Sequence, residues 1–167
     1  MKLISLLLSL LLSQLSFALP LVAAPELTAK AYVLYDYSSN QILLGQNGSA
    51  RMEPASLTKL MTAYLAFDAL KHGTLDLQQE LSVPEKAVHN LNGESRMLLK
   101  AGQKVSVDKL LHGLIIVSGN DAAITLAQYI AGSEPGFVDM MNTEAQRLGM
   151  VNTHFTNSVG LPDAQHY

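Results

Sequence analysis

A serine and a lysine lie three residues apart in the stretch EPASLTKLMTAYLAFDAL, residues 53–70. Most positions of this stretch are apolar, which predicts a single helix with Ser56 and Lys59 in its first turn. Side chains three residues apart share one face of a helix, so the hydroxyl and the amine are expected to meet. The neighbours expected to keep water away from the amine are Leu57, Leu60, Met61 and Tyr64.

A poorly solvated lysine next to a serine can do nucleophilic chemistry. Desolvation lowers the pKa of a lysine because it disfavours the charged form. The neutral amine can then act as a general base toward the neighbouring hydroxyl, which activates a serine without a histidine. The chain contains no cysteine, so a covalent mechanism here has to use serine or threonine.

The Ser-x-x-Lys spacing is weak evidence by itself, because the chain holds a second copy at Ser106-Val107-Asp108-Lys109. There the serine is well placed to cap a helix, and the adjacent Asp108 indicates a solvated first turn. Lys59, in contrast, lies inside an apolar run. The setting rather than the spacing favours the first copy.

A second polar interruption, Ser118-Gly119-Asn120, separates the apolar runs LLHGLIIV and DAAITLAQYIAG. Polar side chains between buried helices are costly unless they are used, although a helix-capping turn would also explain them. Ser38-Ser39-Asn40 has the same spacing but is typical of a hairpin turn.

The remaining pattern predicts a mixed chain with two strands, at 31–35 and 41–44, followed by about four helices. Pro and Gly residues near the helix ends support these boundaries. The stretch 74–102 is expected to be irregular, with Lys100-Ala101-Gly102 as a turn. The ending, 151–167, is also rich in turn residues. The helices are expected within residues 53–72, 106–117, 121–132 and 133–150.

Residues 1–24 have the anatomy of a secretory signal peptide, with one charge, an apolar run and small residues. Cleavage fits after Ala18 or after Ala23. The alternative, a membrane anchor, is disfavoured because the run is shorter than the roughly 20 residues of a bilayer span. The net charge of −3 gives no support for nucleic-acid binding, and the five histidines lack the spacing of metal ligands.

Ser56-Leu57-Thr58-Lys59 at the start of an apolar helix, followed by Ser118-Gly119-Asn120, resembles the penicillin-recognising serine enzymes. Residues 28–167 are most similar to the low-molecular-mass penicillin-binding proteins that act as D-alanyl-D-alanine carboxypeptidases. The resemblance implies an α/β fold of the α+β type, β-lactamase/transpeptidase-like, with helices on an antiparallel sheet of which only the first two strands are present. Residues 25–167 would form the N-terminal part of its catalytic domain.

The resemblance also implies a role for each site residue. Ser56 would be the nucleophile, its backbone N–H would form half of an oxyanion hole, and Lys59 would accept its proton. Ser118 would relay a proton to the leaving group, and Asn120 would hold the substrate amide and brace Lys59. The family's third motif, Lys-Thr/Ser-Gly, is absent after Ser118. The chain is therefore expected to be an N-terminal fragment that is inactive alone.

The implied activity is removal of the terminal D-alanine from peptidoglycan pentapeptides, without a cofactor, with β-lactams as acylating inhibitors. The protein is expected in the periplasm, peripheral to the inner membrane through a C-terminal helix missing here. The alternatives are a D,D-endopeptidase, a class A β-lactamase and a non-catalytic exported helical protein. The β-lactamase is disfavoured because it uses Ser-Asp-Asn, whereas this chain has Gly119 in the middle.

Overall fold

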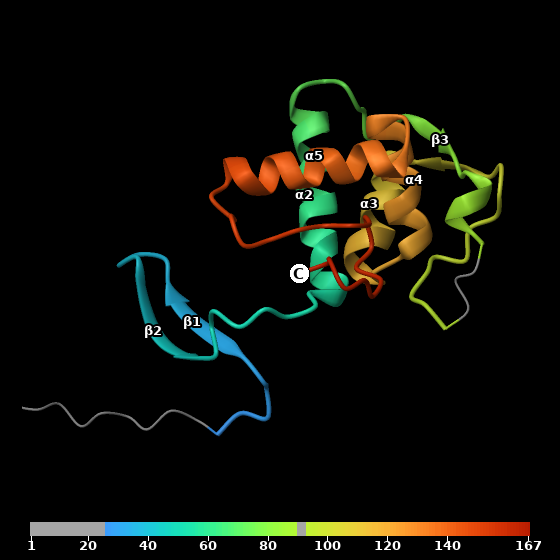
Figure 1. Ribbon diagram of the computed structural model, residues 1–167. Helices are drawn as coiled ribbons and strands as arrows, with labels where there is room; N and C mark the ends of the chain where they lie inside the picture. Colours follow the sequence, from blue (N-terminus) through green and yellow to red (C-terminus); the bar gives the residue numbers. More distant parts are fainter. Residues whose placement is uncertain (1–25, 90–92) are drawn as a thin grey trace, which may run out of the picture. The chain divides into compact units, whose positions relative to one another are not determined.

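The structure, a computed structural model, describes residues 26–89 and 93–167 (Figure 1). Its contacts divide the chain into two compact units, one ending at Ala50 and the other running from Arg51 to Tyr167. The predicted signal peptide, residues 1–24, lies outside the described residues.

The first unit is an antiparallel hairpin of β1, Tyr32–Asp36, and β2, Gln41–Gln46. The Asp36 carboxylate accepts hydrogen bonds from the backbone N–H of Ser38 at 2.9 Å and from the Ser39 hydroxyl at 2.6 Å. Aspartate side chains commonly stabilise turns in this way. The predicted hairpin is confirmed, and its Ser-x-Asn copy belongs to the turn.

The predicted single helix over residues 53–70 is wrong in its first turn. Ala55–Thr58 forms a 3-10 turn, η1, and the α-helix α2 covers Lys59–Lys71. Ala55 has a positive φ of 46°, which no regular right-handed helix contains, so a regular α-helix cannot extend back through this residue. Residues three apart eclipse one another in a 3-10 turn, so Ser56 and Lys59 still share a face.

Three further α-helices follow the predicted pattern: α3, Val107–Ile116, α4, Asn120–Ala131, and α5, Glu134–Arg147. The Ser106 side chain accepts from the Lys109 backbone N–H, which confirms the second Ser-x-x-Lys copy as a helix cap. Ser133 caps α5 in the same way through the Gly136 N–H. These caps explain where α3 and α5 begin.

A second antiparallel strand pair was not predicted. β3, Glu80–Ser82, pairs with β4, Lys104–Ser106, and a 3-10 turn, η2, covers Glu85–Ala87. Strands of three residues are too short to show an alternating pattern, so the stretch around them looked irregular. The expected turn at 100–102 is present, with Gly102 at a φ of 74°.

The second unit is built around two neighbouring apolar clusters. One joins α2, α3, α4 and the β3/β4 pair, with Leu110, Leu81 and Leu126 fully buried. In the other cluster, Phe137 and Met141 of α5 pack against α2 and α4. The burial of α2 is nevertheless one-sided, because apolar residues of the helix stay exposed: Leu60, Tyr64 and Phe67.

Residues 154–167, which we call the C-terminal strap, form no helix or strand. Two backbone hydrogen bonds join His154 to Tyr167, so the strap closes on itself. In Figure 1 the strap, in red, returns to the beginning of α2, in green. Within the described part of the chain, no helix is long and apolar enough to cross a membrane.

Candidate active site

Ser56 and Lys59 meet as the sequence predicts. The Lys59 Nζ donates a hydrogen bond to the Ser56 Oγ at 3.3 Å. The two side chains differ in their access to solvent, because Ser56 is exposed and Lys59 is only 6% exposed. An accessible hydroxyl beside a buried amine is the arrangement that an activated serine nucleophile needs.

Burial lowers the pKa of Lys59, and the negative charge of Glu94 opposes this shift. The direction and the cause, desolvation, agree with the prediction, but most of the residues expected to exclude water are not the ones that do so. Three of the four neighbours expected to exclude water are themselves exposed: Leu57, Leu60 and Tyr64. The amine is instead held from the other side by the C-terminal strap, where the Val159 carbonyl accepts its hydrogen bond at 2.9 Å.

The Val159 carbonyl is fixed by a turn that Asn157 organises. The Asn157 Oδ1 accepts from three successive backbone N–H groups, those of Val159, Gly160 and Leu161, at 3.2, 2.7 and 3.0 Å. An Asx arrangement of this kind fixes the backbone without help from regular structure. The strap therefore presents a positioned acceptor to the amine of Lys59.

The same turn lies directly against the residue before the serine. Gly160 has a φ of 88°, and a Cβ placed on it would lie 1.8 Å from the Ala55 carbonyl oxygen. Only glycine permits both this backbone conformation and this approach. The close contact fixes the entry into the 3-10 turn that carries Ser56.

Two threonines extend the contact between α2 and the strap. The Thr62 hydroxyl donates to the Ser158 carbonyl at 2.7 Å, and the Thr58 Oγ1 lies 2.7 Å from the His166 Nε2. Both threonines are buried. Neither threonine nor the strap is predicted from the sequence to contribute to the site, although polar residues within an apolar stretch are a signal for such contacts.

Ser118 and Asn120 lie at the beginning of α4, where the predicted interruption occurs. Ser118 is half-buried with a φ of 55°, and Asn120 is 2% exposed. The Asn120 Nδ2 donates to the Glu94 carboxylate at 3.4 Å. Among the described residues, no hydrogen bond joins the side chain of Asn120 or Ser118 to Lys59, so their assigned roles stay predictions.

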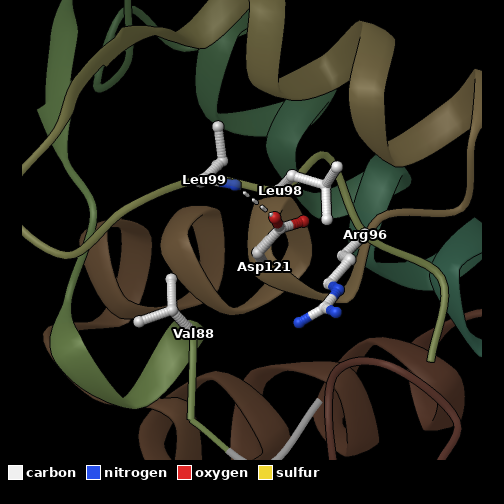
Figure 2. A pocket seen from close by; sticks show the side chains of 5 residues that line it. All are labelled: Val88, Arg96, Leu98, Leu99 and Asp121. Carbon is white, nitrogen blue, oxygen red and sulfur yellow. Dashed lines mark hydrogen bonds between the residues drawn. The ribbon is translucent and has the colours of Figure 1, made fainter. Parts of the chain in front are cut away.

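Asp121 fixes this interruption against the segment that precedes it. Its buried carboxylate accepts from the backbone N–H groups of Met97 at 2.9 Å, Leu99 at 3.0 Å and Ala122 at 3.0 Å. Figure 2 shows the bond to Leu99 beside a cavity of about 160 Å³. A buried carboxylate is tolerated because its oxygens are satisfied in this way.

Glu94 interacts with one residue of each motif, Asn120 of Ser-Gly-Asn and Lys59 of Ser-x-x-Lys. Its carboxylate accepts from Asn120, and its charge acts on the pKa of Lys59. The backbone N–H of Asn120 also donates to the Ser95 carbonyl at 2.8 Å. The segment from Glu94 to Leu99 thus connects the start of α4 to the surroundings of the lysine.

The described residues offer no group of three His, Cys, Asp or Glu side chains that could hold a metal ion. What the site does contain is a hydroxyl exposed to solvent, a buried amine in contact with it, and a hydroxyl and an amide at the start of a neighbouring helix. These groups suit acyl transfer through a serine.

Comparisons with known proteins agree with this chemistry. The family described as D-alanyl-D-alanine carboxypeptidase matches residues 20–167. Carboxypeptidase DacA of Haemophilus influenzae is 44% identical over 147 residues, which cover 87% of this chain and 37% of that protein. DacC of Escherichia coli is 44% identical over 144 residues, covering 84% of this chain and 36% of that protein.

Among solved structures, penicillin binding protein 5 from Haemophilus influenzae is 44% identical with a TM-score of 0.84, over 87% of this chain and 43% of that one. This likeness confirms the predicted fold class. The chain thus spans less than half the length of each of these three proteins. With a family match over nearly all of its length, the chain belongs to the D-alanyl-D-alanine carboxypeptidase family.

Proposed function

We propose that the protein is a serine-type D-Ala-D-Ala carboxypeptidase that removes the terminal D-alanine of peptidoglycan pentapeptides through an acyl-enzyme on Ser56. The observation that carries this proposal is the buried Lys59 amine, which contacts an exposed serine hydroxyl at 3.3 Å. The names of the relatives support the choice of substrate.

In the first half-reaction, the Ser56 Oγ attacks the carbonyl carbon between the two D-alanines while Lys59 takes the hydroxyl proton. The developing oxyanion is stabilised by the Ser56 backbone N–H. Collapse of the tetrahedral intermediate breaks the peptide bond, and Ser118 relays the proton that Lys59 accepted to the departing amine, which returns Lys59 to its neutral form. Asn120 holds the amide of the substrate. Water then hydrolyses the ester and returns the serine hydroxyl.

The proposed site uses no cofactor, and a β-lactam would acylate the same serine because its strained amide occupies the position of the scissile bond. We place the protein in the periplasm, where it would act in cell-wall remodelling. The signal-like composition of residues 1–24 supports export, and the name of the penicillin-binding relative supports β-lactam acylation. Peripheral membrane attachment stays a prediction from the family resemblance.

The direct test is D-alanine release from a muramyl pentapeptide by the full-length protein, compared with cleavage of a cross-linked peptide dimer. We expect rapid release from the pentapeptide and slow cleavage of the dimer. Ser56→Ala is expected to abolish both, whereas Ser38→Ala, in the other Ser-x-Asn copy, leaves release unchanged. Preferential cleavage of the dimer would make the protein a D,D-endopeptidase and contradict the proposal.

A further inference from the structure

His166 is a buried histidine that the mechanism above does not use. It is 2% exposed and belongs to the C-terminal strap, 108 positions along the chain from its partner Thr58. Thr58 lies between the nucleophile and the base in the turn that leads into α2. The imidazole therefore contacts the catalytic turn from a distant part of the sequence.

The surroundings of the ring determine which nitrogen carries the proton. The Thr156 backbone N–H, which can only donate, lies 3.1 Å from the Nδ1, and the Asn157 amide nitrogen lies 3.4 Å from it. The Nδ1 is therefore an acceptor, and in the neutral ring the proton sits on the Nε2. The Nε2–H then donates to the Thr58 Oγ1 at 2.7 Å.

Protonation of the ring would break this arrangement. A second proton on the Nδ1 would face the donors of Thr156 and Asn157, and Asn157 also organises the turn that holds Lys59. The aromatic ring of Phe155 contacts the imidazole edge-on, with ring centroids 5.8 Å apart. The Thr156 Oγ1, 3.1 Å from the Nδ1, could accept from the charged ring, but this form gives up the hydrogen bond from the Thr156 N–H and places a charge in a buried position, which disfavours it.

The charged and titratable groups that act on the ring oppose one another. Burial is the largest cause and lowers the pKa of His166, and His154 lowers it further, whereas Asp163 and Glu53 raise it. The folded chain therefore prefers the neutral ring. Stability from this group is complete above the ordinary pKa of 6.5 and is lost as the pH falls through the lowered value.

We propose that His166 is a positioning residue for the acylation step, which in its neutral form ties Thr58 to the C-terminal strap and so holds Ser56 and Lys59 in register. The inference rests on the proposed function. The Thr58 Oγ1 contacts the His166 Nε2, and the Lys59 Nζ donates to the Val159 carbonyl. The strap therefore contacts two successive residues, the last of η1 and the first of α2. Loss of the contact between Thr58 and His166 would let η1 move relative to the Val159 carbonyl, which accepts the hydrogen bond of Lys59.

The test measures acylation of the full-length protein by a fluorescent penicillin. His166→Ala is expected to slow acylation by about 10²-fold, the size of effect that a small misplacement of reacting groups produces. His166→Gln should recover most of the rate, because its amide N–H can still reach Thr58. His72→Gln, at an exposed histidine that follows the last residue of α2, is the matched control and should acylate normally.

A pH profile separates positioning from a purely structural role. In the wild type, the logarithm of the acylation rate should steepen below pH 6.5, where His166 gains a proton in addition to Lys59. In His166→Gln, the logarithm of the acylation rate should fall with the slope of a single proton over the whole acidic range. Thr58→Val removes the partner of the histidine, so its profile should also lack the steeper part.

Several results would overturn the inference. Coinciding profiles of the wild type and His166→Gln would do so, and so would a wild-type rate in His166→Ala. If His166→Ala fails to fold in a thermal-unfolding control, the His166→Gln profile decides. A wild-type protein that penicillin does not acylate at all would overturn the proposed function and the inference together, which distinguishes that failure from the others.

Discussion

Replacing Lys59 with methionine is expected to lower the rate of acylation by about 10²–10⁴-fold, the contribution that a general base usually makes. The reason is that the buried amine is the group in contact with the Ser56 hydroxyl, at 3.3 Å. Methionine has a similar length and fills the same space without a base. The measurement is the rate of labelling by a fluorescent penicillin, and Lys71→Met, at the exposed end of α2, is the matched control.

Lys59→Arg keeps the positive charge but cannot lose a proton at neutral pH, so it should be as slow as Lys59→Met. Wild-type labelling of the arginine variant would show that charge rather than basicity matters, and would contradict the assignment of Lys59 as the base.

The same pKa shift predicts how folding stability depends on pH. Burial lowers the pKa of Lys59 below its ordinary value of 10.5 in the folded state. The unfolded chain then binds more protons between these two values, so wild-type stability should rise as the pH climbs through the folded pKa toward 10.5. In Lys59→Met this rise should be missing from urea unfolding curves recorded at neutral and alkaline pH.

Replacing Gly160 with alanine is expected to destabilise the fold by about 3 kcal/mol, from the combined cost of a positive φ and an overpacked contact. The added Cβ would lie 1.8 Å from the Ala55 carbonyl oxygen, so either the strap or the entry to the 3-10 turn must move. Because Ser56 is the next residue, penicillin labelling should fall as well. Urea unfolding and the labelling rate together check this prediction.

Gly132→Ala provides the control for backbone strain alone. Gly132 ends α4 with a φ of 74°, and a Cβ there would have no atom within 4 Å. The cost is therefore expected to be about 1 kcal/mol, with normal labelling. Equal losses in the two variants would show that the contact between Gly160 and Ala55 contributes nothing to the site.

The Ser56–Lys59 contact could be predicted because the two residues are close in the sequence. Residues three positions apart lie on the same face of both an α-helix and a 3-10 helix. The cap at Ser106 could be predicted for the same reason, since a hydroxyl before an apolar run has a local effect, whereas the cap at Ser133 was not predicted. The error at the start of α2 came from Ala55, an ordinary residue in a left-handed conformation that no local preference predicts.

The surroundings of Lys59 could not be read from the sequence, because they depend on contacts that are remote along the chain. Val159 lies 100 positions from Lys59, and its carbonyl is a backbone group without any signature in the side chains. The strap looked like an irregular ending, although it supplies the acceptor for the amine. Glu94 was missed for the same reason, since only the fold brings it to Asn120.

The most direct test of the central claim is the position of the covalent adduct after reaction of the full-length protein with penicillin. Intact mass followed by peptide mapping should show one penicilloyl group, on Ser56. The adduct should disappear in Ser56→Ala and persist in Ser106→Ala, which removes the serine of the other Ser-x-x-Lys copy. An adduct on Ser106 or Ser118, or one that persists in Ser56→Ala, would contradict the assignment of Ser56 as the nucleophile.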